Sequence, residues 1–287
     1  MKFAKMHGAG NDFIIINNMD GAIPTELLPR LAAGLCAQHI SVGADGLMVV
    51  ARPEHGGDYR MLFFNSDGST GEMCGNGARC IARYGYENGL AGETQRIETT
   101  AGLVVGQRVS ERLYRIRLND PSVVDLHRIV NVGGEKYDCA YVELGNPGIP
   151  HAILCLPDHD ERDRDELRSL GRALRYAPEF PRGANVSFVK ETGTGSVKAV
   201  TYERGVEDLT LACGTGCGSI AVALRLLGRS GDEFDVSMPG GKLHTSLSVV
   251  DGAVRDIYLT GPTNYVCTGE ILDEDVLPLL FNAEKHG

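Results

Sequence analysis

The sequence lacks any apolar run near the ~18–20 residues that a membrane-spanning helix requires. It also lacks a surplus of basic residues, because 28 Lys and Arg stand against 38 Asp and Glu, for a formal net charge of −10. Nucleic acids and anionic membrane surfaces both require a basic face. We therefore expect neither nucleic acid nor a membrane as partner, and we attribute the acidity to solubility.

The amino-terminal stretch MKFAKMHGAGNDFIII contains no long apolar segment and no small-residue cleavage site. It is therefore not expected to act as a signal peptide. We expect a cytoplasmic protein whose thiols are kept reduced.

No Cys-x-x-Cys pair occurs among the eight cysteines, which are Cys36, Cys74, Cys80, Cys139, Cys155, Cys213, Cys217 and Cys267. Zinc fingers and redox dithiols usually use that spacing, so a metal site or a redox pair is the weaker interpretation. In a long chain with reduced thiols, cysteines more often serve as small buried hydrophobes, nucleophiles or bases.

Long helical patterns are also few, whereas short β-rich runs separated by turn residues recur. The runs are 13–16, 47–50, 59–64, 113–118, 141–144, 152–156, 186–189, 198–202, 243–250 and 254–261. Helices are expected at 25–38, 76–89, 162–177, 214–228 and 274–281. Many strands with few long helices predict an α+β fold with much antiparallel pairing. The loop-rich stretch 119–138 is the expected linker.

The sequence repeats one short phrase at an offset of 139 residues: CGNGARCIARYG from Cys74 and CGTGCGSIAVAL from Cys213. The preceding strands also correspond, with RMLFFNSDGS matching KAVTYERGVED. A weaker third correspondence joins GNDFIII to GNPGIPHAIL. Chance is a poorer explanation than repetition because the flanking elements agree. We therefore expect two similar domains that bring Cys74 opposite Cys213.

Each copy predicts a helix that begins just after a cysteine and two glycines. The start of a helix offers unpaired backbone N–H groups and a partial positive charge, and glycine allows an anion to approach the backbone closely. The same field is expected to lower the pKa of the cysteine there. Two such helix starts would hold a carboxylate, with one sulfur on each side.

A carbon between a thiolate and a thiol can lose its proton to one and regain a proton from the other on the opposite face. This is two-base racemisation or epimerisation, and fixed N–H donors would stabilise the enediolate-like intermediate. A hydrolase with a single nucleophile would need only one copy of the motif. A carboxylate-binding protein without catalysis would need the backbone cradle but not both thiols. Cys80 and Cys217 lie in the expected helices, and core packing accounts for them.

At this point the sequence resembles the pyridoxal-independent diaminopimelate epimerase family over nearly its whole length. The matching motifs are HGAGNDF (7–13), VGADG (42–46), NSDGSTGEMCGNGARC (65–80), GNPGIPH (145–151), GANVSFV (183–189), ERGVEDLTLACGTG (203–216), PGGKL (239–243) and LTGPTNYVCTGE (259–270). The resemblance implies two similar α/β domains related by a pseudo two-fold, each with mainly antiparallel strands around a central helix. It also implies an active site in the cleft between them. The expected domains are 1–120 joined by 264–287, and 121–263.

The resemblance also implies roles for individual residues. Cys74 and Cys213 would be the catalytic acid and base, and Glu203 would hold the α-ammonium group. Arg204 would pair with the distal carboxylate. The other substrate-binding residues implied are Asn11, Asn65, Gly75, Asn76, Asn146, His151, Asn185, Gly214 and Thr215. Asp12, Asp67 and Arg79 are expected to order turns and helix ends.

The sequence departs from the family pattern at two positions. The usual Gly-Asn-Pro-His is enlarged to Gly-Asn-Pro-Gly-Ile-Pro-His, which separates Asn146 from His151 and leaves the two as alternatives for the family position. The usual glycine-glutamate after the Glu-Arg-Gly motif is replaced by 207–209, Glu-Asp-Leu. A racemase for another amino acid therefore remains an alternative to a diaminopimelate epimerase.

The same resemblance implies a small-molecule amino-acid substrate, no metal and no pyridoxal phosphate or other cofactor. A homodimer is compatible with the sequence, which does not determine the oligomeric state. Nor does the sequence determine which cysteine is the thiolate at rest.

Overall fold

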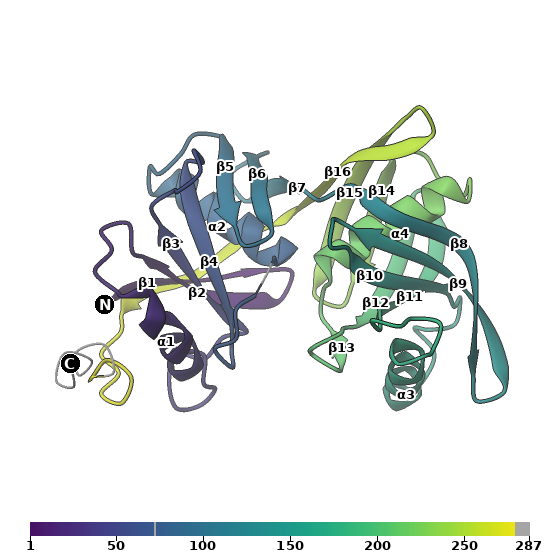
Figure 1. Cartoon of the computed structure of the whole chain (residues 1–287), viewed down its shortest axis with the longest axis horizontal. Helices are drawn as coiled ribbons and strands as arrows, with labels where there is room; N and C mark the ends of the chain where they lie inside the picture. Colours follow the sequence, from purple (N-terminus) through teal and green to yellow (C-terminus); the bar gives the residue numbers. More distant parts are fainter. Residues whose placement is uncertain (72, 279–287) are drawn as a thin grey trace. The chain divides into compact units, whose positions relative to one another are not determined.

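The computed structural model describes residues 1–71 and 73–278, which divide into two compact units (Figure 1). Unit 1 comprises Met1–Ile116 and the segment from Pro262 onward, and unit 2 comprises Arg117–Gly261. Both are rich in strands and poor in helices. The prediction of an α+β fold with two similar α/β domains is confirmed.

Unit 1 is built on an eight-stranded sheet in which the last strand of the chain pairs with the first. The strands run in the order β17, β1, β2, β3, β4, β5, β6, β7. Their bounds are β1 Lys2–Gly8, β2 Asn11–Asn17, β3 Gly46–Ala51, β4 Tyr59–Asn65, β5 Thr94–Thr99, β6 Gly102–Arg108, β7 Leu113–Arg117 and β17 Asn264–Glu270. The helices are η1 Thr25–Leu27, α1 Leu28–Leu35 and α2 Gly75–Glu87.

Unit 2 uses the order β8, β9, β10, β11, β12, β14, β15, β16, with the short β13 added beside β12. The strand bounds are β8 Pro121–Val132, β9 Glu135–Leu144, β10 Ile149–Cys155, β11 Asn185–Gly193, β12 Ser196–Tyr202, β13 Leu209–Thr210, β14 Glu233–Met238, β15 Gly241–Val250 and β16 Ala253–Pro262. The helices are α3 Arg164–Arg175 and α4 Gly214–Leu226.

The two sheets share one pattern of strand directions. From β17 in unit 1 and from β8 in unit 2, successive pairings are antiparallel, antiparallel, parallel, antiparallel, parallel, antiparallel and antiparallel. In this pattern α2 corresponds to α4, and β2 corresponds to β10. The repeat inferred from the cysteine phrases is therefore a repeat of the whole domain topology.

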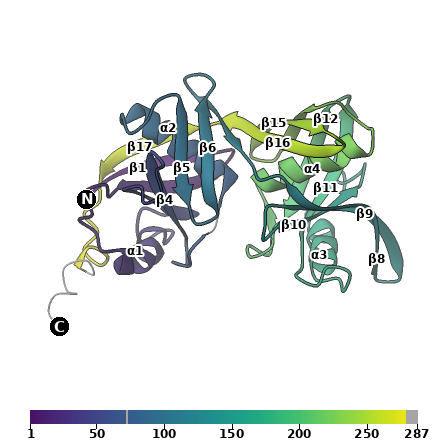
Figure 2. The same cartoon turned by 45° about the horizontal axis from the view of Figure 1, so that its top comes forward.

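Each repeated helix is embedded in its own unit, as Figure 2 lets the reader follow. Every residue of α2 from Gly75 to Gly85 is buried, and the helix contacts β1, β2 and β6. A side chain at Gly77 would meet Met48 Cε at 1.7 Å, so the glycine permits this close approach to the sheet. In unit 2, α4 contacts β8, β9, β10, β11, β14 and β15.

The remaining helices cover other sheet surfaces and follow ordinary start signals. Leu28, Leu31 and Leu35 of α1 join a core formed with β2, β3 and β4. The Asp163 side chain caps α3 by accepting from the backbone N–H groups of Asp165 and Glu166. Of the helix expected over 274–281, residues 279–281 lie outside the described residues.

The linker prediction for 119–138 is wrong, because this stretch forms most of the β8–β9 hairpin. Gly133 and Gly134 turn the chain with φ values of 60° and 87°. Six of the twelve residues of β8 are exposed and only Val130 is buried, so the strand lacks the alternation of apolar and polar residues that marks a half-buried strand. Strands β1, β5, β6, β14 and β17 were likewise not predicted.

No helix in the described part of the chain is long and apolar enough to cross a membrane.

Candidate active site

In unit 1 the strand register brings three polar residues, Asn11, Asp45 and Asn65, together where the neighbouring strands β2, β3 and β4 begin or end. Phe13 lies opposite Gly46 in the parallel β2–β3 pair, and Gly46 lies opposite Asn65 in the antiparallel β3–β4 pair. Asn11 lies two residues before Phe13, and Asp45 lies one residue before Gly46. The start of β2, the start of β3 and the end of β4 therefore lie together.

Cys74 lies directly before α2 and contacts this edge. Its backbone is extended, with φ −124° and ψ 116°, and its carbonyl accepts from Ala78 N at 2.8 Å. Its thiol donates to Asn11 Oδ1 at 3.3 Å. The structure thus brings Asn11 to the sulfur of the first predicted catalytic cysteine.

The first turn of α2 is stabilised from within by a buried arginine. Arg79 donates through Nη1 to the Gly75 carbonyl at 3.2 Å and through Nη2 to Asn76 Oδ1 at 2.9 Å. Arg79 therefore orders the helix start, as expected. The amide oxygen of Asn76 is engaged by this arginine, and its backbone N–H lies in the first turn of α2.

Asn65 ends β4 in an exposed turn. Its Nδ2 donates to Ser69 Oγ at 2.9 Å, and Ser69 in turn donates to Asp67 Oδ1 through both its hydroxyl and its backbone N–H. These bonds lower the pKa of the Asp67 carboxyl. Asp67 is thus a turn residue that orients Ser69 toward Asn65.

In unit 2 the corresponding edge contains His151 and Asn185, which lie opposite each other in the parallel β10–β11 pair. Asn185 Nδ2 donates to the Pro150 carbonyl at 3.1 Å, and its Oδ1 accepts from Arg204 N at 2.8 Å. The amide of Asn185 therefore ties the start of β10 to the segment after β12.

Cys213 lies directly before α4, with an extended backbone like that of Cys74. Its sulfur is 3.8 Å from Thr215 Oγ1, and that hydroxyl is 3.0 Å from His151 Nε2. A Cβ at Gly216 would come within 3.2 Å of the Cys213 sulfur, so glycine leaves room for the thiol. The structure thus links His151, Thr215 and Cys213 in one buried chain of polar groups.

Burial dominates the acid-base properties of this chain. It raises the pKa of the Cys213 thiol well above its ordinary value, and the charge of Glu203 adds to the effect, while the Gly216 N–H and the Thr215 hydroxyl oppose it. The sequence predicted a lowered pKa from the helix start. For Cys213 without substrate that prediction is wrong, because the cost of burying a thiolate exceeds the stabilisation from the helix start.

Burial also keeps His151 neutral. Its side chain is fully buried, which lowers its pKa to about 3, with a further lowering from the charge of Arg204. A neutral imidazole can donate from one nitrogen and accept at the other. His151 can therefore exchange a hydrogen bond with Thr215 without carrying charge.

Glu203 and Arg204 follow β12 directly. Glu203 Oε1 accepts from Thr210 Oγ1 at 2.5 Å, and Arg204 Nη1 donates to the Arg182 carbonyl at 3.4 Å. Glu203 is half-buried and Arg204 is exposed. Both lie near the polar chain, because each changes the pKa of one of its members.

The enlarged loop separates its two predicted binding residues. Asn146 is exposed in the turn after β9, whereas His151 is buried on β10 beside Thr215. Sequence reasoning missed what supports this loop: Glu143 accepts from Tyr141 and forms an ion pair with Arg182. A Cβ at Gly148 would lie 2.6 Å from Glu143 Cβ, so the loop packs directly on this glutamate.

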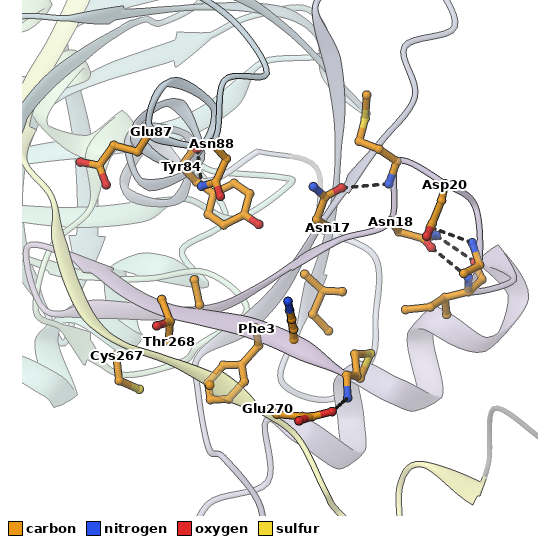
Figure 3. A pocket seen from close by; sticks show the side chains of 18 of the residues that line it. Phe3, Asn17, Asn18, Asp20, Tyr84, Glu87, Asn88, Cys267, Thr268 and Glu270 are labelled. Atoms are coloured by element: carbon orange, nitrogen blue, oxygen red, sulfur yellow. Dashed lines mark hydrogen bonds and ion pairs between the residues drawn. The ribbon is translucent and has the colours of Figure 1, made fainter.

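Unit 1 also contains a pocket away from Cys74, lined by β1, β17, the segment 17–24 and the end of α2 (Figure 3). Asn18 is occupied in bracing the loop, since it donates to the Ile23 carbonyl and accepts from Ile23 N, both at 2.9 Å. Among the described residues that line this pocket, none was predicted to bind substrate. Within 1–71 and 73–278, no three His, Cys, Asp or Glu side chains are grouped to hold a metal ion.

Comparison with known proteins identifies the family that this chain matches. A family model described as diaminopimelate epimerase matches residues 3–116 and 144–266. The chain is 36% identical over 284 residues to "Diaminopimelate epimerase" of Aquifex aeolicus, covering 96% of this chain and 99% of that protein. It is 38% identical over 279 residues to the protein of that name from Archaeoglobus fulgidus, covering 93% and 95%.

Solved structures show the same fold at lower identity. A Bacillus anthracis phenazine biosynthesis protein of the PhzF family aligns with a TM-score of 0.70 at 16% identity, covering 95% of this chain and 99% of the other. A hydroxyproline epimerase from Agrobacterium vitis aligns with a TM-score of 0.67 at 20% identity, covering 96% and 93%. At these identities the likeness concerns the fold.

Proposed function

Because this chain belongs to the diaminopimelate epimerase family and is an isomerase of the epimerase type, we propose that it converts LL-diaminopimelate to meso-diaminopimelate by a two-base mechanism. The observation that carries the mechanism is the pair of cysteines, Cys74 and Cys213, each lying directly before a glycine-led helix in equivalent positions of a repeated fold. The proposal requires both sulfurs to reach opposite faces of one carbon.

The two helix starts would bind the α-carboxylate. The backbone N–H groups of Gly75, Asn76, Gly214 and Thr215 lie in the first turns of α2 and α4, at the positive end of each helix dipole. Those dipoles favour an anion. They would also stabilise the additional charge that develops on the carboxylate when the α-proton leaves.

The chemistry then needs only a proton exchange. One thiolate takes the α-proton, the electrons of the C–H bond move into the enediolate, and the other thiol gives its proton to the opposite face. The new C–H bond restores the carboxylate, so the substrate is neither oxidised nor reduced. We expect no metal and no pyridoxal cofactor, and we would test this by dialysis against chelator and a scan for pyridoxal absorbance.

Substrate binding would prepare Cys213 for this step. Glu203 lies close enough to raise the pKa of the Cys213 thiol, and we assign it to the α-ammonium group of the substrate. An ammonium paired with Glu203 would cancel that repulsion and make the thiolate more accessible. Thr215 and the neutral His151 supply a polar contact to the sulfur that does not add charge.

The distal end of the substrate would meet the other polar residues. Arg204 is exposed and provides a planar guanidinium for the second carboxylate. Asn11, Asn65 and Asn185 are assigned to the remaining polar groups of the substrate, as is Asn146. The altered loop is the feature that favours a second candidate, a racemase for another amino acid.

The mechanism is tested by Cys74→Ala and Cys213→Ala, with Cys267→Ala as control because Cys267 is exposed on β17. We expect each active-site variant to lose epimerisation by about 10²–10⁴-fold, the range for a missing acid or base. Cys267→Ala should keep wild-type activity. Exchange of the α-proton with solvent deuterium is followed in parallel. Undiminished epimerisation in either active-site variant would exclude the two-base mechanism.

The substrate is tested by a panel that sets LL-diaminopimelate beside proline, hydroxyproline, histidine and other monoacids. We expect the highest kcat/KM for diaminopimelate, because a monoacid leaves Arg204 without a partner. Preference for a monoacid would replace the proposed substrate and keep the two-base chemistry.

Two wider features complete the proposal. We place the protein in the cytoplasm, where reduced thiols are maintained. We also propose a homodimer, which light scattering on the purified protein would test directly against a monomer.

A further inference from the structure

We propose that Asp45 is a positioning residue: it fixes the orientation of the Asn11 amide and thereby holds Cys74 as the protonated thiol before substrate binds. This inference rests on the proposed function in one respect: it says which of the two catalytic cysteines carries a proton before the reaction begins. It is carried by contacts within unit 1.

The first step is the orientation of the amide. Asn11 Nδ2 donates to Asp45 Oδ2 at 2.6 Å, and the backbone N–H of Asp12 donates to the same oxygen at 3.0 Å. A carboxylate can only accept, so the nitrogen of the Asn11 amide must face Asp45. The amide oxygen must then face the other way.

The second step is the identity of the group at the sulfur. Asn11 Oδ1 is 3.3 Å from Cys74 Sγ, and a carbonyl oxygen can only accept a hydrogen bond. A thiol satisfies this contact by donating its S–H, whereas a thiolate would place two electron-rich atoms against each other. The contact therefore opposes the field of the helix start and favours the proton on Cys74.

The third step is the rigidity of Asp45, which is exposed to solvent. Asp45 and Asp12 exchange backbone-to-carboxylate hydrogen bonds, since Asp45 N donates to Asp12 Oδ1 at 3.0 Å. Lys5 Nζ forms an ion pair with Asp12 Oδ2 at 2.7 Å, which offsets the charge of two neighbouring carboxylates. These bonds continue the parallel β2–β3 pairing, so Asp45 is held by the sheet.

The assignment has a consequence for catalysis. Cys74 enters the first turnover as the acid, so Cys213, after its thiol has released its proton to solvent as the substrate binds, acts as the base on the isomer whose α-hydrogen faces it. Turnover transfers the proton, leaving Cys74 as thiolate and Cys213 as thiol. The opposite isomer binds productively to that second form.

The test is the rate at which Cys74 reacts with iodoacetamide at pH 7 without substrate, followed by peptide mass mapping. In Asp45→Asn, residue 45 can donate as well as accept, so the Asn11 amide is free to turn its N–H₂ toward the sulfur. We expect Cys74 in this variant to react at least about tenfold faster, since thiolate is the reactive form. Asp45→Glu, which keeps a carboxylate, should restore slow reaction.

Asp58→Asn is the matched control, because Asp58 is also an exposed carboxylate of unit 1 and accepts from a backbone N–H, that of Arg96 at 2.6 Å. It should leave the rate at Cys74 unchanged. Thermal melts of all variants separate a loss of structure from a change at the sulfur. Equal rates at Cys74 in the wild type and a folded Asp45→Asn variant would overturn the proposal.

A second test uses only the wild-type protein and therefore does not depend on whether Asp45→Asn folds. The pH at which Cys74 becomes half-maximally reactive should lie above about 8.5, the ordinary value for a cysteine. A midpoint at or below that value overturns the assignment. Neither measurement needs turnover, so a failure of the proposed function and a failure of this inference are distinguishable.

Discussion

At the scale of the residue, the two repeated cysteines differ in their surroundings. The half-buried Cys74 donates to the carbonyl oxygen of Asn11, whereas the buried Cys213 lies beside the Thr215 hydroxyl. A repeated motif therefore does not imply two equal thiols. The differences come from neighbours that the motif does not contain.

A residue-scale prediction concerns His151, whose folded pKa of about 3 lies below its ordinary value because the ring is buried. The unfolded chain binds a proton at this residue as the pH falls below about 6.5, whereas the folded chain stays neutral until about pH 3. Stability contributed by the neutral ring is therefore present above pH 6.5 and is lost as the pH falls toward 3.

We expect His151→Gln to reduce the loss of unfolding free energy between pH 7 and pH 5 by about 2 kcal/mol. Urea unfolding at the two pH values measures this difference. His55→Gln, at an exposed position, should retain the wild-type pH dependence. An unchanged pH dependence in His151→Gln would show that the ring titrates normally in the folded protein.

At the scale of the element, the enlarged loop before β10 decides where His151 lies. Gly148 packs on Glu143, whose ion pair with Arg182 holds the glutamate, and the Pro150 carbonyl is held by Asn185. Both contacts lie within the altered sequence, one at Gly148 and one at Pro150 in the start of β10. We therefore expect the backbone of this loop to help position His151.

We expect Gly148→Ala to lower kcat/KM for the substrate by about tenfold or more, since a displacement of about 1 Å at a positioned group has effects of this size. The added Cβ would lie 2.6 Å from Glu143 Cβ and 2.9 Å from Ser122 Oγ, neither of which is the end of a long flexible side chain. The loop and His151 must shift instead. Steady-state kinetics and thermal melts measure the result.

Gly231→Ala is the control, because a Cβ at Gly231 meets no atom within 4 Å. It should keep the kinetics of the wild type. Matching kinetics in the two variants would argue that the loop backbone does not position the site.

At the scale of the whole molecule, two units of one topology each provide a helix that begins after a cysteine. The chain passes between the units twice, at Ile116–Arg117 and at Gly261–Pro262. Each unit alone has a single cysteine in this setting. The proposed two-base inversion uses one from each.

We expect mild oxidation to join Cys74 to Cys213 and to abolish activity, because a mechanism that acts on one carbon must bring the two sulfurs near each other. Peptide mapping under non-reducing conditions detects the bridge, and reduction should restore activity. The Cys267→Ala background removes the exposed thiol as a competing partner. Full activity after oxidation with no 74–213 peptide would contradict a shared site.

Features that depend on contiguous residues were predicted from the sequence, whereas features that depend on residues far apart in the chain were not. The buried strand β3 and the helix α4 were predicted because their apolar runs are contiguous. Strand β8 was missed because its largely exposed side chains carry no alternating pattern, whereas the 141–144 part of β9 was predicted. Asp45 lies inside the VGADG motif (42–46), yet its proposed role depends on a hydrogen bond with Asn11, 34 residues away in the chain.

The sequence by itself determined the family, the repeat and the two cysteines that begin its helices, because these are contiguous patterns of residue type. Only the tertiary structure decided the surroundings of each thiol. Thr215 meets His151 across 64 residues, and burial depends on strands from throughout a unit. A pKa follows from neighbours and solvent, which the fold assembles from residues far apart in the chain.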